Sequence, residues 1–229
     1  MRPSTILQKE LASRVGIPDA AADLVVPLHG GPTEAIASIL PGNPLAEDWI
    51  AALDVPGDRL ICWSGTLAEE LFADEPRTWM QPGHNALHAF CTSVAPALES
   101  DTKRLLLRPH ARHVLSDPQS ALDFLRTHTD GPFGLALSPC DLLLPEMLPH
   151  LEEHLERILG VLAPQVDILF LEDAQPGDDG ASMTHAPIGE GILPVELTRQ
   201  LLADLPEEMP LVVRPTETRQ ALAWIGVAE

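Results

Sequence analysis

Six short apolar runs, separated by longer amphipathic segments, constrain the fold of this chain more than any other feature of its sequence. The runs occupy residues 24–28 (LVVPL), 60–63 (LICW), 105–107 (LLL), 133–137 (FGLAL), 168–171 (ILFL) and 211–213 (LVV). Each run is continuously apolar instead of alternating, which is the pattern of parallel strands that are buried on both faces. The sequence therefore predicts a largely parallel sheet at the centre of the protein.

The segments between the runs predict helices, over residues 6–15, 85–98, 117–128, 146–162, 195–205 and 216–227. From about residue 60 onward, strand, loop and helix follow one another repeatedly, and right-handed crossovers then close or nearly close a parallel sheet. No glycine-rich nucleotide-binding pattern follows any strand. We therefore expect a (β/α) TIM-type barrel as a single domain, 1–229, in which residues 175–191 form one long loop.

The chain is strongly acidic, with a formal net charge of -20. Lys9 and Lys103 are the only lysines, and the sequence contains no basic cluster. Such a charge opposes binding to nucleic-acid phosphates and to anionic membrane surfaces. No apolar run reaches the roughly 18 residues of a membrane span. We therefore expect no nucleic-acid or membrane partner, and the acidity is interpreted as a means of solubility.

The cysteines favour a reducing compartment. Cys62, Cys91 and Cys140 are odd in number and far apart, and no CxxC motif occurs. This pattern indicates reduced, buried thiols instead of a disulfide framework or a zinc knuckle. Residues 1–17 carry charged side chains and lack an apolar segment of signal-peptide length. The expected localisation is cytoplasmic.

Polar side chains follow four of the predicted strands, where a barrel of this kind carries its chemistry. The relevant stretches are RPHA (108–111), SPCD (138–141), FLEDA (170–174) and VRPTE (213–217). A loop between the last two contains IGEG (188–191). The candidates for ligand binding are Arg108, His110, Ser138, Asp141, Glu172, Asp173 and Arg214.

These five stretches, in this order, resemble the sugar phosphate isomerase/epimerase family, the xylose-isomerase-like TIM barrels. In that family successive strands end in an E-P-H-like motif, D-P-x-H and H-x-K-D-A, a loop carries G-E-G, and the last strand ends in a second Glu. The resemblance covers roughly residues 85–227. It implies a TIM barrel and an isomerase or epimerase ancestry.

The resemblance does not extend to the metal ligands. Family members hold a divalent metal with Glu, Asp, His and Glu at positions that correspond here to Arg108, Ser138, Phe170 and Arg214. Arginine is always cationic and phenylalanine offers no lone pair, so neither is a ligand for a hard metal. Two arginines in place of two glutamates change the local charge by about +4. We therefore expect no metal and no cofactor, and the family's metal-assisted proton or hydride transfer is not carried over.

Other positions of the motifs match in part. The family's D-P-x-H histidine is Asp141 here and its H-x-K-D lysine is Glu172, whereas His110 and Asp173 match the family. A set of His110, Asp141, Glu172 and Asp173 could form a displaced metal site. His110 and His113 could act as acid or base near neutral pH, or be hydrogen-bonded structural groups.

The two arginines allow two interpretations. Arg108 and Arg214 could form an anion site for a sugar phosphate or carboxylate, since the guanidinium presents a fixed fork of donors. Alternatively, each arginine neutralises an acidic neighbour and fills the space that a metal left. The acidic residues available for that purpose are Asp141, Glu172, Asp173 and Glu217.

The beginning of the chain departs from the family as well. Family barrels have eight strands, and the apolar runs predict six. Residues 6–28 resemble the family's second helix and third strand, as if the first two strands were missing. The barrel could be open, a second subunit could complete it as a homo-oligomer, or short strands could be hidden within residues 33–54.

Three functions are compatible with these observations. The first is a divergent, metal-free family member that binds a small anionic or sugar-derived ligand with little or no standard metal-dependent turnover. The second is an active isomerase or epimerase with a relocated metal site. The third is a non-catalytic pseudoenzyme that binds a partner or acts as a scaffold.

Overall fold

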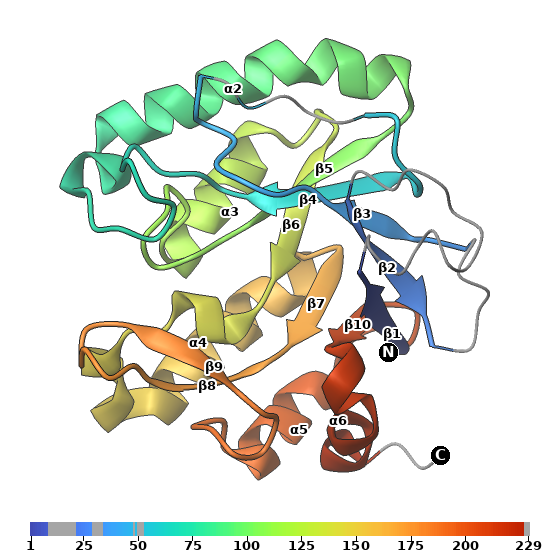
Figure 1. Cartoon of the computed structure of the whole chain (residues 1–229), viewed down its shortest axis with the longest axis vertical. Coiled ribbons are helices and arrows are strands. Elements are labelled where there is room, and N and C mark those ends of the chain that lie inside the picture. The colour runs from blue at the N-terminus through green and yellow to red at the C-terminus, as the bar shows by residue number, and fades with distance from the viewer. Residues whose placement is uncertain (9–21, 29–33, 48, 50–52, 227–229) are drawn as a thin grey trace.

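Eight strands close into a barrel in the computed structural model, which describes residues 1–8, 22–28, 34–47, 49 and 53–226 (Figure 1). The strands follow one another around the barrel in the order β1, β10, β7, β6, β5, β4, β3, β2. Their bounds are β1 Arg2–Leu7, β2 Asp23–Pro27, β3 Ala37–Ile39, β4 Arg59–Trp63, β5 Arg104–Arg108, β6 Phe133–Leu137, β7 Ile168–Leu171 and β10 Pro210–Val213. The predicted TIM-type barrel is confirmed.

The strands alternate between two apolar clusters, which explains why their sequences are continuously apolar. One cluster lies in the interior of the barrel and is formed by every second residue of the strands. It includes Ile61, Leu106, Ala136, Phe170 and Val212. The intervening positions, such as 105, 107, 135, 137, 169 and 171, belong to the larger cluster that the helices cover. Both faces of these strands are therefore buried, as the sequence predicts.

Helices cover the outside of the parallel wall (Figure 1). They are α2 Gln81–Ser100, α3 Pro118–Thr127, α4 Leu151–Leu162, α5 Val195–Ala203 and α6 Thr218–Ile225. Five predicted helices are thus confirmed, although the fourth begins as a 3-10 segment, Pro145–His150. The side chain of Asp117 caps α3, because it accepts hydrogen bonds from the backbone N–H groups of Gln119 and Ser120. Among the described residues, no helix has the length and hydropathy needed to cross a membrane.

The N-terminal part of the chain corrects the prediction of an incomplete barrel. Strand β1 pairs in parallel with β10, and β2 runs antiparallel to both β1 and β3. An open barrel and a wall supplied by a second subunit are therefore wrong, whereas a short strand within residues 33–54 is confirmed as β3. Because the barrel is closed within one chain, it gives no argument for a homo-oligomer, and the homo-oligomer stays a prediction.

The same region corrects the start of the first predicted helix, whereas the comparison of residues 6–28 with the family's second helix and third strand falls mostly outside the described part of the chain. Ile6 and Leu7 belong to β1 and pair with β2, while residues 9–15 lie outside the described part of the chain. Strand β1 escaped notice because it contains Pro3 and is mostly half-buried, so it shows no apolar run. Strand β3 has only three residues.

The predicted loop 175–191 is also wrong in part. Strands β8 Asp173–Pro176 and β9 Met183–Ala186 form an antiparallel hairpin outside the barrel sheet (Figure 1). Half of the residues in each strand are exposed, so the hairpin lacks the apolar runs by which the other strands were predicted.

The three thiols are free and buried, as the sequence predicts. Burial raises the pKa of Cys91 to about 12 and raises the pKa values of Cys62 and Cys140 as well. Cys140 donates a hydrogen bond from Sγ to the backbone oxygen of Glu172 at 3.1 Å. Since the thiolate is the reactive form, these cysteines are expected to be inert.

Candidate functional site

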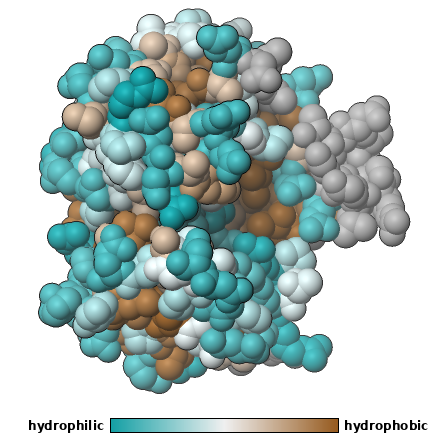
Figure 2. Space-filling model, turned by 60° about the vertical axis from the view of Figure 1, so that its left-hand side comes forward, coloured by the Kyte–Doolittle hydropathy of each residue, from teal (hydrophilic) through white to brown (hydrophobic). Residues whose placement is uncertain are grey.

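A cavity of about 560 Å³ opens where the parallel strands end, the position at which TIM barrels carry their sites. Residues at the ends of β4, β5 and β10, and residues that follow β6 and β7, form one part of its lining. The β8–β9 hairpin supplies another part. Strand β4 points to the left in Figure 1, and Figure 2, which brings that side forward, shows a surface hollowed near its centre.

Arg108, the last residue of β5, is enclosed by two carboxylates and two aromatic rings, which together form the Arg108 cluster. Its Nε donates to Asp141 Oδ2 at 2.6 Å, and its Nη2 donates to the carboxylate of Glu172. Its Cζ lies 4.8 Å from the ring centroid of Trp63 and 4.4 Å from that of Phe170. The guanidinium is thus bound at its edges by anions and at its faces by rings, both favourable geometries.

The position of the Arg108 guanidinium explains why Asp141 and Glu172 can stand where the family motifs have a histidine and a lysine. Glu172 follows β7, and Asp141 lies in the 3-10 turn that follows β6, Pro139–Leu142. Arg108 spans from β5 to both of them, with only 13% of its side chain exposed. These contacts support the interpretation in which an arginine neutralises acidic neighbours.

The two carboxylates of the cluster differ in their affinity for protons. Burial raises the pKa of Asp141 to about 6, against the opposing effect of Arg108 and with a further increase from Glu172. Burial also acts to raise the pKa of Glu172, but Arg108 and Arg214 lower it below its ordinary value. Glu172 is therefore the ionised partner that both arginines share, and Asp141 takes up the first proton as the pH falls.

Arg214 follows β10 and occupies the open side of the pocket. Its Nη2 lies 3.1 Å from Glu172 Oε1, and 41% of its side chain is exposed. Its Nε is buried and has no hydrogen-bond partner among the described residues. One edge of this guanidinium is therefore held by Glu172, while an unsatisfied donor remains on the same side chain.

His110 and His113 are held as neutral groups. The Nδ1 atom of His110 accepts the backbone N–H of Arg112 at 3.1 Å, and Nε2 of His113 lies 2.8 Å from the backbone oxygen of Leu71. Burial lowers the pKa of His110 to about 3, helped by His113, Arg108 and Arg112, and lowers that of His113 to about 4. His110 lines the pocket as an uncharged ring, and His113 is fully buried.

Asp173 has the contacts of a structural anchor. Its Oδ1 accepts the N–H groups of Ala174 at 2.8 Å and Leu193 at 3.0 Å, and its Oδ2 accepts those of Gly189 at 2.9 Å and Gly191 at 3.1 Å. A Cβ at Gly191 would lie 2.3 Å from Asp173 Oδ1, so only glycine permits this approach. The IGEG stretch is thus bound to the aspartate that follows β7.

Ser138 does not reach the pocket. It is fully buried, it is absent from the residues that line the cavity, and its hydroxyl has no partner among the described residues. The structure therefore brings Arg108, His110, Asp141, Glu172, Asp173 and Arg214 to one pocket and leaves Ser138 beneath it.

The residues present do not fit the family's metal. Arg108, Phe170 and Arg214 offer no metal-binding lone pair at three of the four corresponding positions. The displaced site gains no support either, because no three His, Cys, Asp or Glu side chains within the described ranges are placed to hold a metal ion.

Two functional candidates escaped sequence reasoning. His185 lies on β9 and lines the pocket, and its Nε2 is 2.8 Å from Oε1 of Glu217. The other oxygen of Glu217 accepts the N–H of Ile188 at 3.1 Å. The sequence indicates Glu217 only as a partner for arginine, and it places His185 within the predicted loop. The signal that could have found it is a histidine in a long segment that follows a barrel strand.

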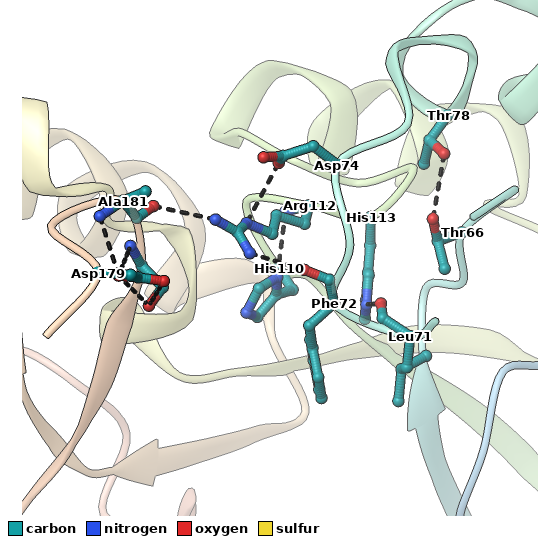
Figure 3. A network of polar contacts seen from close by, with 11 residues as sticks. Thr66, Leu71, Phe72, Asp74, Thr78, His110, Arg112, His113, Asp179 and Ala181 are labelled. Atoms are coloured by element: carbon teal, nitrogen blue, oxygen red, sulfur yellow. Dashed lines mark hydrogen bonds and ion pairs between the residues drawn. The ribbon is translucent and has the colours of Figure 1, made fainter. Parts of the chain in front are cut away.

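Arg112 connects two segments that border the pocket (Figure 3). Its Nη1 donates to the backbone oxygen of Phe72 at 2.7 Å, and its Nη2 donates to that of Ala181 at 2.9 Å. Its Nε lies 3.2 Å from Asp74 Oδ1. Asp179 closes the hairpin turn by accepting the N–H of Ala181 at 2.9 Å. The segment after β4 and the tip of the hairpin are therefore joined through one side chain of the loop after β5.

Known structures place this barrel in a recognisable class, although no protein-family model and no curated protein matches the sequence. A xylose isomerase-like TIM barrel protein from Mycobacterium smegmatis, determined in complex with magnesium, aligns with a TM-score of 0.51 and 14% identity. The alignment covers 75% of this chain and 63% of that one. The chain thus spans less than two thirds of the length of that protein.

Two further known structures align with the same barrel. A D-tagatose 3-epimerase-like protein aligns with a TM-score of 0.54 and 12% identity, over 82% of this chain and 73% of that chain. Endonuclease IV from Thermus thermophilus aligns with a TM-score of 0.52 and 14% identity, over 75% and 63% of the two chains. At such identities the similarity shows the fold alone: the chain has the xylose isomerase-like TIM barrel fold.

Proposed function

We propose that this chain is a divergent relative of the sugar isomerases and epimerases that binds a small anionic or sugar-derived ligand in its pocket, without the standard metal-dependent turnover. The observation that carries the proposal is the Arg108 guanidinium, which sits between Asp141 and Glu172. A divalent cation and its ligands would require that space, and Arg108 and Arg214 would repel the cation.

The partly exposed arginine of the pocket supports an anionic ligand. Arg108 and Arg214 balance Asp141 and Glu172, so these four groups are close to neutral together. Since Arg108 is enclosed, Arg214 is the cation with surface left for a ligand. A phosphate or carboxylate that accepts from the exposed part of the Arg214 guanidinium would add a charge-assisted hydrogen bond without uncovering the Arg108 cluster.

The rest of the lining suits a polar molecule of sugar size. Trp63 and His110 contribute ring surfaces, and Asp141 and Glu172 contribute acceptors. The volume of about 560 Å³ lies within the range of pockets that enclose small molecules. Apolar surface combined with a few placed polar groups is the usual composition of such a site.

Thermal unfolding of the EDTA-treated protein tests the proposal. Ribulose 5-phosphate and inorganic phosphate should each raise the melting temperature in a saturable way, whereas Mn²⁺, Mg²⁺, Co²⁺ and Zn²⁺ should not. The rise should disappear in R214A and persist in R157A, which removes an exposed arginine from α4. A saturable rise with a metal would support a metal-dependent enzyme instead. No rise with either anion would favour a scaffold.

A further inference from the structure

We propose that His185 and Glu217 form an acid–base pair that transfers protons, without a metal, on a ligand anchored by Arg214. This inference rests on the proposed function, because it needs a small anionic, sugar-derived ligand in the pocket. The chemical class is a phosphorylated ketose or a similar compound with a C–H group beside a carbonyl.

Glu217 is placed to orient an imidazole. It ends the 3-10 turn that follows β10, Pro215–Glu217, and is buried, with 9% of its surface exposed. Its Oε1 lies 2.8 Å from His185 Nε2, and its Oε2 accepts the N–H of Ile188 at 3.1 Å. With both oxygens engaged, the carboxylate holds one ring nitrogen of His185, the arrangement that orients a histidine base in other enzymes.

His185 leaves its second nitrogen for a ligand. About a third of its side chain, 34%, is exposed, and the residue lines the same pocket as Arg214 and Glu172. Its Nδ1 makes no hydrogen bond to any residue that the structure describes. When Nε2 carries the proton toward Glu217, Nδ1 holds a lone pair that can accept another proton.

His185 differs from the two other histidines that surround this end of the barrel. His110 and His113 are buried, and burial lowers the pKa of each far below neutrality, so neither can exchange protons with a ligand near pH 7. His110 also uses Nδ1 to accept a backbone N–H. Of the described histidines that line the pocket, His185 is the one with a carboxylate partner and an open nitrogen.

The proposed step balances without a further reactant. His185 Nδ1 takes a proton from the carbon beside the carbonyl, the C–H electron pair forms a carbon–carbon double bond, and the carbonyl pair moves to oxygen. Arg214 stabilises the negative charge of this enediolate. Return of a proton from His185 to the same face of that carbon restores the carbonyl with its configuration retained, and the hydrogen has been exchanged when the proton on His185 came from solvent.

A merely structural pairing would give the same contact, since β9 could be held to the barrel through Glu217. The hairpin, however, has other attachments. Asp173 binds the IGEG stretch, Arg112 holds the backbone oxygen of Ala181 at 2.9 Å, and the N–H of Ile192 donates to the backbone oxygen of Ala174 at 2.9 Å. The position of the hairpin therefore does not depend on His185 alone.

Incorporation of deuterium from D₂O tests the inference, measured by NMR on ribulose 5-phosphate, fructose 6-phosphate and dihydroxyacetone phosphate in the presence of EDTA. The wild-type protein should exchange the hydrogen beside the carbonyl of at least one of them. H185Q should lower kcat about 100-fold or more, with little change in KM or melting temperature. Glutamine keeps an N–H that can donate to Glu217 but cannot take up a proton near neutral pH.

Controls separate the proton-transfer role from a structural one. H150Q, which replaces an exposed histidine outside the pocket, should behave as the wild type. E217Q should reduce kcat more than it raises KM, because it disturbs the orientation of His185 while Arg214 still holds the ligand. A role in structure alone would instead lower the melting temperature of H185Q and E217Q and leave kcat unaffected in whatever protein remains folded.

Binding and exchange distinguish the two proposals. If the wild-type protein binds a ketose phosphate but exchanges none of its hydrogens, or if H185Q exchanges at the wild-type rate, the acid–base pair is refuted and the binding function stands. If none of the three compounds binds and none exchanges, the proposed function fails, and the acid–base pair fails with it.

Discussion

Arg108 ends β5 and Arg214 follows β10 at the same end of the barrel, yet the environments of the two arginines differ. Arg108 contacts two carboxylates and two rings and has 13% of its side chain exposed. Arg214 contacts one carboxylate, has 41% of its side chain exposed and keeps a donor without a partner among the described residues. Burial and the number of partners, and not the residue type, decide which arginine is part of the structure and which is available to a ligand.

Removal of the enclosed cation should have the largest effect on stability. In R108M, Asp141 and Glu172 would face each other with one counter-ion fewer in a buried place. The free energy of unfolding should fall by about 3–5 kcal/mol, the usual cost of breaking a buried ion pair from one side. Urea unfolding measures it.

A matched variant isolates the cause. R108M/D141N removes one carboxylate together with the cation and leaves Glu172 paired with Arg214, so it should regain most of the lost stability, because the remaining charges balance. A loss of less than about 1 kcal/mol in R108M would show that the cluster resembles an exposed ion pair, and the distinction between the two arginines would be lost.

The next largest effect is expected in the pH dependence of stability. The folded-state pKa values of His110 and His113 are lowered to about 3 and about 4, so their contribution is complete above the ordinary value near 6.5 and is lost as the pH falls. Asp141 acts in the opposite direction, because its folded-state pKa is raised to about 6. Two histidines against one carboxyl should leave a net loss of stability between pH 6.5 and pH 5.

The expected slope is about 1.4 kcal/mol per pH unit for each net proton that the unfolded chain takes up. In H110Q/H113Q the loss over this range should vanish or reverse, since Asp141 then dominates. Urea unfolding at several pH values provides the measurement, and an unchanged slope in the double variant would show that these rings are not kept neutral by the fold.

A smaller effect is expected at Arg112, which joins two segments that border the pocket and contacts neither Glu172 nor Asp141 in the hydrogen bonds described above. R112M should lower the free energy of unfolding by about 1–2 kcal/mol through the loss of its hydrogen bonds. Amide exchange should accelerate near Phe72 and Ala181, the residues whose backbone oxygens it contacts. Equal acceleration throughout the barrel would mean that Arg112 supports the whole fold and not these two segments.

The smallest effect on stability is expected at Arg214. In R214A the free energy of unfolding should change by less than about 1 kcal/mol, because 41% of the side chain is exposed to water and its partner Glu172 is shared with Arg108. Binding of ribulose 5-phosphate should nevertheless be lost. A destabilisation as large as that of R108M would place Arg214 among the structural groups.

Much of the fold could be predicted, because the parallel strands are buried on both faces and therefore appear in the sequence as continuous apolar runs. The strands that escaped are of another kind. Strand β1 carries Pro3 and half-buried side chains, β3 has three residues, and the β8–β9 hairpin is largely exposed. Such strands are defined by their partners across the sheet, and a single sequence does not reveal those partners.

The candidate site was likewise predictable only in part. The strand-end positions of Arg108, Asp141, Glu172 and Arg214 followed from the order of the motifs, and so did the option that arginine neutralises the acids. The sequence could not tell which acid each arginine contacts. The pair of His185 and Glu217 joins residues 32 apart through a hairpin that was not predicted, so it became visible only in three dimensions.

We propose that the Arg108 guanidinium occupies the space between Asp141 and Glu172 that a divalent cation would need. Elemental analysis tests it most directly, on protein purified without chelator, incubated with Mn²⁺ and passed through a desalting column. We expect far less than one equivalent of any divalent metal per chain. One tightly held equivalent would contradict it, and would mean that Asp141 and Glu172 exchange their arginine for a metal ion.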